Sequence, residues 1–143
     1  MHEVQLDQIH AEDLEFLRQL RNAERQWFFD QTEVTPEAQA AWFRSLQDDR
    51  RSRWFMVRVD GTPAGCFSIR VDDADRAEVR CILLSPQFRG HGVMNKAIGD
   101  AMAQMGDHLR YFTEVMPDND NSLKMFERLG FRRRFVSLER TAK

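Results

Sequence analysis

The sequence predicts a single α/β domain built on one mixed β-sheet. Strand-like segments fill residues 54–84, helical periodicity returns after Gly92, and another strand-like segment follows at Tyr111–Met116. A helix that connects two strands of one sheet lets them run parallel, so we expect at least one parallel pair. The chain has 143 residues, which fits one compact domain spanning residues 1–143.

The N-terminal third is predicted to hold one strand and two helices. His2–Leu6 resembles a short strand, and Asp13–Ala23 carries leucines at helical spacing. Thr35 followed by Pro36 is typical of a helix start, because threonine can cap the first amides and proline suits the first turn. This second helix should run to about Leu46.

Three strands should follow, joined by tight turns. Trp54–Val59 and Ala64–Val71 read as a hairpin around Asp60-Gly61-Thr62-Pro63. A polar turn at Asp72–Asp75 then leads into a third strand, Glu78–Leu84. Apolar residues four apart predict a helix after Gly92.

The C-terminal part completes the expected sheet. Tyr111–Met116 should be a strand, Ser122–Leu129 a short helix, and Phe131–Leu138 a closing strand. Asn119 or Asp120 can cap the short helix.

Composition excludes several classes of function. The formal net charge of −2 gives no reason to expect nucleic acid or an anionic membrane as a partner. Cys66 and Cys81 lie in apolar runs, which favours buried thiols in a reducing compartment. The chain shows no signal peptide and no apolar run long enough for a bilayer, so a cytoplasmic location is expected. The four histidines have no metal-ligand spacing, and no metal is expected.

A glycine-containing loop between the third strand and the following helix is the most informative segment. In Gln87-Phe88-Arg89-Gly90-His91-Gly92 the glycines let the backbone approach an anion, and the first amides of the helix lack partners. Arg89 adds a charged donor. The spacing differs from the dinucleotide and nucleoside-triphosphate loops. We therefore expect a phosphate or pyrophosphate site of another kind.

The pattern Gln87-x-x-Gly90-x-Gly92 resembles the acyl-CoA pyrophosphate loop of GNAT N-acyltransferases. The resemblance implies a mostly antiparallel sheet splayed at one parallel pair, with about four helices on its faces. It also implies acetyl-CoA as co-substrate, with the pantetheine arm lying along the strand before the loop. The residues implied to contact it here are Leu83, Leu84, Gln87, Phe88, Arg89, Gly90, His91, Gly92, Val93 and Met94.

A second block supports the same resemblance. Asn119-x-x-Ser122-x-x-x-Phe126-x-x-x-Gly130-Phe131 is similar to a family pattern that has tyrosine where this chain has Phe126. The block adds Asn119, Ser122 and Phe126 to the implied cofactor contacts. In chemical terms, Gly130 can take the left-handed conformation that ends a helix. Met94 departs from the family pattern, which often has a small residue there.

Four segments of the N-terminal half resemble a GNAT subset that includes ribosomal-protein N-terminal acetyltransferases: Leu20-Arg21-Asn22, Trp27-Phe28-Phe29, Thr35-Pro36-Glu37 and Trp42-Phe43. The resemblance to nucleotide-amino-sugar N-acetyltransferases is closer still. By that resemblance Arg21, Asn22, Trp27 and Phe28 would shape the acceptor pocket. The alternative is that the aromatic residues only pack the helices onto the sheet.

The expected chemistry needs a base. An alkyl ammonium has a pKa of about 10.4, so it must lose a proton before attack. Glu78 occupies a place where many GNAT enzymes carry a carboxylate base, and Glu114 on the next strand is the alternative. Phe126 cannot donate a proton, but a thiol of pKa about 8.5 leaves tolerably well as a thiolate.

The sequence thus predicts an N-acetyltransferase for a small primary amine, such as a nucleotide-linked amino sugar. Two alternatives stay open. One is a protein N-terminal or lysine acetyltransferase. The other is a non-catalytic acyl-CoA sensor, which is consistent with Phe126 in place of the family's tyrosine. The basic clusters Arg50–Arg53 and Arg132–Arg134 are either solvated faces or phosphate contacts. Self-association as a homodimer also stays open.

Overall fold

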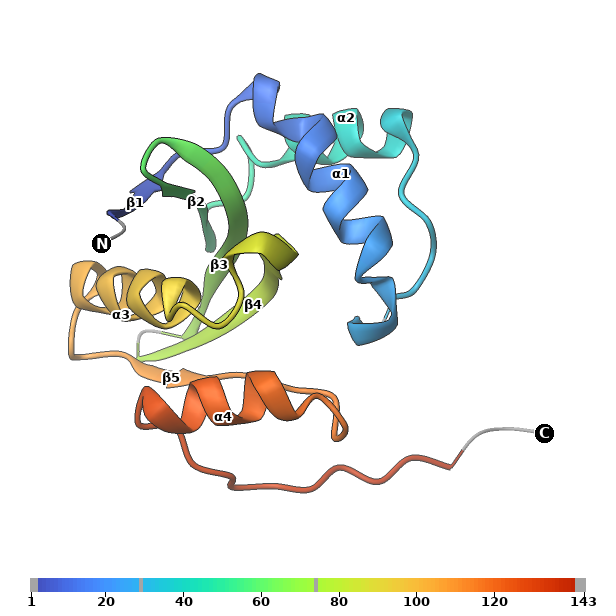
Figure 1. Cartoon of the computed structure of the whole chain (residues 1–143). Coiled ribbons are helices and arrows are strands. Elements are labelled where there is room, and N and C mark those ends of the chain that lie inside the picture. Colours follow the sequence, from blue (N-terminus) through green and yellow to red (C-terminus); the bar gives the residue numbers. More distant parts are fainter. Residues whose placement is uncertain (1–2, 29, 74, 141–143) are drawn as a thin grey trace.

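A computed structural model describes residues 3–28, 30–73 and 75–140. They contain one five-stranded sheet whose strands lie in chain order (Figure 1). The first three pairings are antiparallel and the last is parallel. The strands are β1 (Val4–Asp7), β2 (Ser52–Val59), β3 (Thr62–Asp73), β4 (Arg76–Leu84) and β5 (Arg110–Phe112). The predicted mixed sheet with one parallel pair is confirmed.

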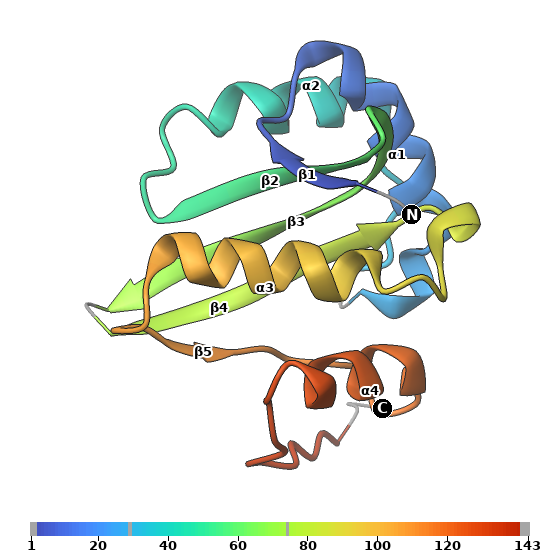
Figure 2. The ribbon, with the colours of Figure 1, turned by 60° about the vertical axis from the view of Figure 1, so that its left-hand side comes forward.

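Helices cover both faces of the sheet (Figure 2). Helices α1 (Leu14–Ala23) and α2 (Pro36–Ser45) lie on one side, and α3 (Val93–Met105) lies on the other. Helix α4 (Asp120–Arg128) packs beside α3. Three short 3₁₀ helices complete the described chain: η1 (Ala11–Asp13), η2 (Arg25–Trp27) and η3 (Pro86–Phe88).

The sheet separates two apolar clusters because successive strand residues point to opposite faces. The larger cluster, under α3 and α4, includes Phe55, Val57 and Phe67. The smaller cluster, under α1, joins Met56 of β2 to Leu17, Leu20, Cys66 and Leu83. Leu83, near the end of β4 that diverges from β5, therefore packs against α1.

The predicted helix signals hold in the structure. The hydroxyl of Thr35 accepts a hydrogen bond from the Ala38 amide at 3.1 Å, and Asn119 caps α4 by accepting from the Ser122 amide at 3.3 Å. Gly130 has φ of +94° and ends α4. The following amide, of Phe131, donates back to the Phe126 carbonyl.

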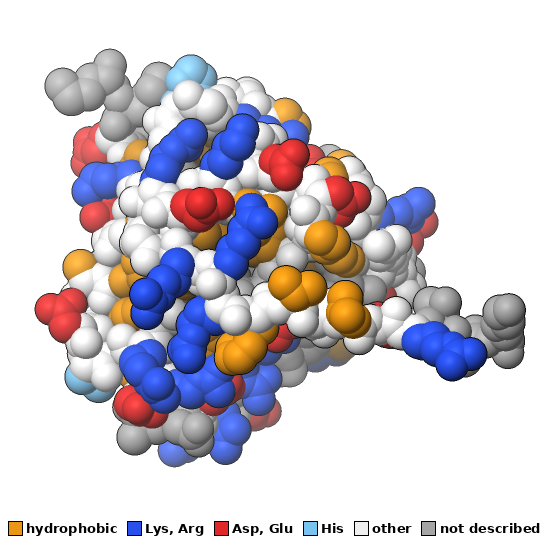
Figure 3. Space-filling model, turned by 90° about the horizontal axis from the view of Figure 1, so that it is seen from below, with side chains coloured by type: hydrophobic (Ala, Val, Ile, Leu, Met, Phe, Trp, Pro, Cys, Tyr) orange, Lys and Arg blue, Asp and Glu red, His pale blue; other side chains and the backbone are white. Residues whose placement is uncertain are grey.

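Two expectations about the C-terminal strands are wrong. β5 spans only Arg110–Phe112, not Tyr111–Met116, because its pairing with β4 stops where the two strands diverge. Residues 131–138 form no strand and run along the side of α4 that faces away from β5, without a sheet partner among the described residues. Figure 3 shows apolar and basic side chains mixed on this lower face of the molecule. His2, the first residue of the predicted opening strand, and Ala74 in a predicted turn lie outside the described residues.

A buried ion pair fastens the start of α1 to the sheet. Arg58 of β2 donates to both carboxylate oxygens of Asp13, at 3.1 and 2.9 Å, and also to Asp7 at 2.9 Å. Burial raises the pKa of Asp13, but the hydrogen bonds from Arg58 and the His10 amide outweigh this and leave that pKa below its usual value. The ionised form of Asp13 therefore stabilises the fold.

Asp13→Asn should lower the free energy of unfolding at neutral pH by about 2–4 kcal/mol, because Arg58 would keep its charge in a largely buried place. The lowered pKa means that this contribution is present above the ordinary carboxyl pKa and is lost as pH falls through the folded-state value. Urea titrations at neutral and acidic pH should show the difference between wild type and variant shrinking in acid. The control is Asp7→Asn, because Asp7 is the more exposed partner of the same arginine. This substitution should lower the free energy of unfolding clearly less than Asp13→Asn does. Equal losses would contradict this account.

Candidate functional site

The parallel strands β4 and β5 diverge and leave one edge of β4 open. They pair only at Arg76–Arg110, Ala77–Tyr111 and Glu78–Phe112. One step further, the Thr113 hydroxyl donates to the Val79 carbonyl at 2.8 Å. Beyond that contact, residues 80–84 have a strand partner only on the β3 side among the described residues. Their other side can accept an extended ligand arm through backbone hydrogen bonds.

The open edge leads directly into the glycine-containing loop. After η3, Gly90 and Gly92 have φ of +80° and +72°, a region that suits glycine. Gly92 is the N-cap of α3 and has no side chain to cap the first amides of the helix. A pocket of about 360 Å³ beside the loop is lined by Thr62, Gln87, Phe88, His91 and Val93. This arrangement suits a phosphate group.

The side chains of the loop divide into two groups. Gln87, Arg89 and His91 are exposed. Val93 and Met94, at 2% and 4% exposure, belong to the core under α3. The two buried residues therefore offer a ligand mainly their backbone amides.

Arg89 of the loop forms an ion pair with Glu24, which directly follows α1. The contact joins two predicted regions, the phosphate loop and the acceptor-side helix. Nothing in the sequence pattern indicated Glu24, because the pair depends on how α1 lies across the sheet.

The second sequence block builds α4 and not an open surface. The Asn119 side chain caps the helix at Ser122. Phe126 is 3% exposed and packs edge-to-face on Phe131, with ring centroids 5.0 Å apart. A tyrosine hydroxyl is absent here, and the ring fills the core.

Glu78 lies at the last paired position before the strands diverge. Ala77 and Val79 face the α3 side, so strand alternation turns Glu78 toward α1. Burial raises the pKa of Glu78 and the nearby Glu114 raises it further, while Arg80, at 3.7 Å, opposes both. Glu114 is exposed in the segment after β5. The structure thus brings the two predicted carboxylates into one neighbourhood.

A β-bulge in β4 lies between Glu78 and Leu83. Cys81 has φ of +55°, and the register of β3 against β4 shifts at this point. Burial raises the pKa of the Cys81 thiol, which disfavours the nucleophilic thiolate. No sequence signal marked this bulge, since a bulge depends on the register with the neighbouring strand.

The four predicted acceptor residues lie near the end of α1, in η2 and directly after η2. The Arg21 guanidinium stacks on Phe28, 3.8 Å from the ring centroid, and Phe28 packs against the cluster that contains Leu83. Asn22 exchanges two hydrogen bonds with the backbone of Val34, at 2.7 and 3.0 Å, and so holds the loop before α2. Trp27 is 37% exposed. Arg21 and Phe28 therefore stand together, close to the open edge of β4.

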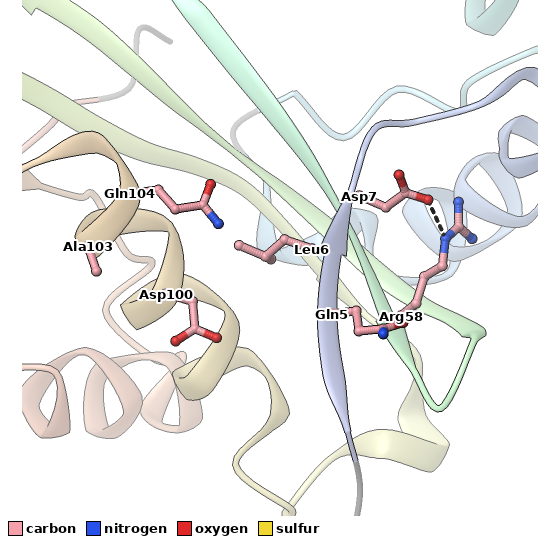
Figure 4. A pocket seen from close by; sticks show the side chains of 7 residues that line it. All are labelled: Gln5, Leu6, Asp7, Arg58, Asp100, Ala103 and Gln104. Atoms are coloured by element: carbon pink, nitrogen blue, oxygen red, sulfur yellow. Dashed lines mark hydrogen bonds and ion pairs between the residues drawn. The ribbon is translucent and has the colours of Figure 1, made fainter.

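A larger pocket of about 640 Å³ lies at the opposite edge of the sheet, between β1 and α3 (Figure 4). Leu6 points toward α3 there, while Asp7 and Arg58 are joined by their ion pair on the other side of β1. No predicted site residue lines it. Over the described ranges, no three His, Cys, Asp or Glu residues are placed to hold a metal ion, and no helix is long and apolar enough to cross a bilayer.

Comparison with known proteins adds one family and several solved structures. The family model of the GNAT acetyltransferases matches residues 14–131. No curated protein matches the chain. A domain from Methanocaldococcus jannaschii DSM 2661 has a TM-score of 0.80 at 21% identity, with 97% of this chain and 94% of that chain covered.

Two acetyltransferases whose structures contain CoA have the same fold. Spermidine N-acetyltransferase from Vibrio cholerae, in complex with CoA and spermine, has a TM-score of 0.77 at 19% identity, covering 89% of this chain and 79% of that one. RimL, a ribosomal L7/L12 alpha-N-protein acetyltransferase in complex with CoA, has a TM-score of 0.74 at 18% identity, covering 87% and 77%. At these identities the likeness shows the fold.

Proposed function

The chain belongs to the GNAT family of acetyltransferases, and from this we propose that it transfers an acetyl group from acetyl-CoA to the primary amine of a small molecule. One observation carries the proposal. The open edge of β4 leads, through the short helix η3, to the Gly90–Gly92 loop and to the first turn of α3, which has no side-chain cap. An extended arm followed by a pyrophosphate fits such a path.

In this proposal the backbone of Leu83 and Leu84 holds the pantetheine arm, and the loop amides hold the pyrophosphate. Gln87, Arg89 and His91 offer exposed polar side chains beside it. Val93 and Met94 contribute backbone amides, since their side chains are buried. Asn119, Ser122 and Phe126 act by building α4, and Phe88 lines the pocket beside the loop.

Glu78 is the proposed general base. Acetyl-CoA would supply an activated carbonyl and a thiolate leaving group. The amine must arrive neutral, and a carboxylate with a raised pKa accepts a proton more readily than an ordinary one. Glu114 is the alternative base. If Glu78 is the base, the negative charge of Glu114 helps it by raising the pKa of Glu78.

No side chain is assigned as the acid that protonates the leaving thiolate. Phe126 has no acidic group, and the only tyrosine, Tyr111, keeps its hydroxyl within 3.1 Å of the carbonyls of Met102 and Gly106 at the other end of α3. A thiolate of pKa about 8.5 can leave without protonation. Phe126 is buried in the core, so packing alone accounts for a phenylalanine at this position. The missing tyrosine therefore does not by itself favour a sensor.

Calorimetric titration with acetyl-CoA tests the cofactor half of the proposal. We expect a dissociation constant between about 1 μM and 1 mM, the range in which enzyme substrates commonly act. Acetyl-CoA lacking the 3′-phosphate serves as the control for contacts outside the proposed path. No heat of binding at millimolar acetyl-CoA would overturn the proposal.

A further inference from the structure

Arg21 carries a buried polar atom that no protein group satisfies. Its Nη1 is shielded from solvent and has no hydrogen-bond partner among the described residues. The described residues also provide no ion pair for this guanidinium. An unpaired buried donor on a charged group is costly, so native proteins rarely keep one without a partner.

The rest of the guanidinium is held firmly in place. Nη2 donates to the Asp30 carbonyl at 2.5 Å, and the plane stacks on Phe28. The bridge from Asn22 to Val34 fixes the loop that carries these partners. The fold therefore uses Nη2 and the plane of the Arg21 guanidinium, and the N–H donors of Nη1 are left without an acceptor.

The leftover donor belongs to the α1 side of the sheet, where Glu78 also points. Burial lowers the pKa of Arg21, and the nearby Asp30 and Cys81 offset part of that shift. Cys81, in the bulge of β4, is therefore close to the Arg21 guanidinium. Phe28 packs against the cluster of Leu83, on the strand that carries both Glu78 and Cys81. An acceptor amine facing Glu78 would thus lie on the same side of the sheet as Arg21.

We propose that Arg21 binds an anionic group, a carboxylate or a phosphate, on the acceptor amine. This rests on the proposed function, and it narrows the acceptor to amines that carry such a group. The planar fork of arginine suits both anions, and stacking on Phe28 fixes its orientation before the ligand arrives.

Two matched pairs of acceptors test this proposal: an amino acid against its amide, and a hexosamine phosphate against the free hexosamine. Wild type should prefer the anionic member of at least one pair, and the pair identifies which anion is bound. In Arg21→Met the ratio of kcat/KM for anionic over neutral acceptor should fall by about tenfold to a hundredfold, mainly through KM. Arg21→Lys should restore part of it.

Arg25→Met is the control, since Arg25 lies in the next turn and pairs with Glu33 on the surface; it should leave the ratio unchanged. Equal use of anionic and neutral amines, or a ratio unaffected by Arg21→Met, would overturn the anionic acceptor while leaving the transferase intact. No turnover of any amine by protein that binds acetyl-CoA would overturn both.

Discussion

Glu78→Gln should lower kcat/KM for the acceptor amine by about 10²–10⁴-fold and leave acetyl-CoA binding unchanged. Glutamine keeps the shape of the side chain but cannot accept the proton that the substrate ammonium must lose before the amine attacks. Steady-state kinetics with the best acceptor, together with calorimetry on the same sample, measures both quantities. A loss confined to acetyl-CoA binding would contradict the role of Glu78 as base.

The same residue should set the acidic limb of the pH profile. A base works only when deprotonated, so activity falls as pH drops through its pKa. Burial and Glu114 raise the pKa of Glu78, which moves that limb above the usual glutamate range. Glu114→Gln is the matched control: it should shift the limb toward lower pH and keep most of the activity. If Glu114→Gln instead removes activity and Glu78→Gln does not, Glu114 is the base.

Gly92→Ala should weaken acetyl-CoA binding by about tenfold to a hundredfold. Gly92 has φ of +72°, which an alanine adopts only with strain, and it is the N-cap from which the free amides of α3 begin. The unliganded fold leaves open space around its Cβ position, so the loss should come from shifted amides and from the approach of the ligand. Calorimetry gives the affinity, and thermal unfolding gives the change in stability.

Gly61→Ala is the control for backbone strain. Gly61 has φ of +83° in the β2–β3 turn and also has open space around its Cβ position. Both variants should lose similar stability, about 1–2 kcal/mol, but only Gly92→Ala should lose affinity. Equal affinities for the two variants would contradict the placement of the pyrophosphate at the loop.

The sequence predicted those parts of the fold that depend on near neighbours in the chain. The cap at Thr35, the left-handed glycine at Gly130 and the turn at Asp60–Gly61 need only a few adjacent residues. Their positions in the structure match the expectation. The parallel pair was predicted for a similar reason, because a helix lies between the two strands.

Features that depend on a distant partner were missed or misjudged. Whether residues 131–138 form a strand depends on an available sheet edge, and α4 lies between this segment and β5. The length of β5 depends on where β4 diverges, and the bulge at Cys81 depends on the β3–β4 register. The contact of Arg89 with Glu24 depends on the position of α1. Residue order alone does not fix any of these.

The candidate site divides in the same way. The loop of residues 87–92 was predicted from its motif, and the two carboxylates from the resemblance to GNAT enzymes. The structure adds which of their groups are accessible. The stacking of Arg21 on Phe28 and its unpaired donor emerge only from the folded chain. Their roles in binding and catalysis stay predictions.

Thiol release from acetyl-CoA in the presence of a panel of primary amines is the decisive test of the proposed acetyl transfer. The panel includes the anionic and neutral pairs described above, and mass spectrometry follows the amine in each reaction. We predict amine-dependent thiol release matched by one acetyl group gained on the amine nitrogen. Tight binding of acetyl-CoA without thiol release for any amine would contradict the claim and favour a protein that binds acyl-CoA without turning it over.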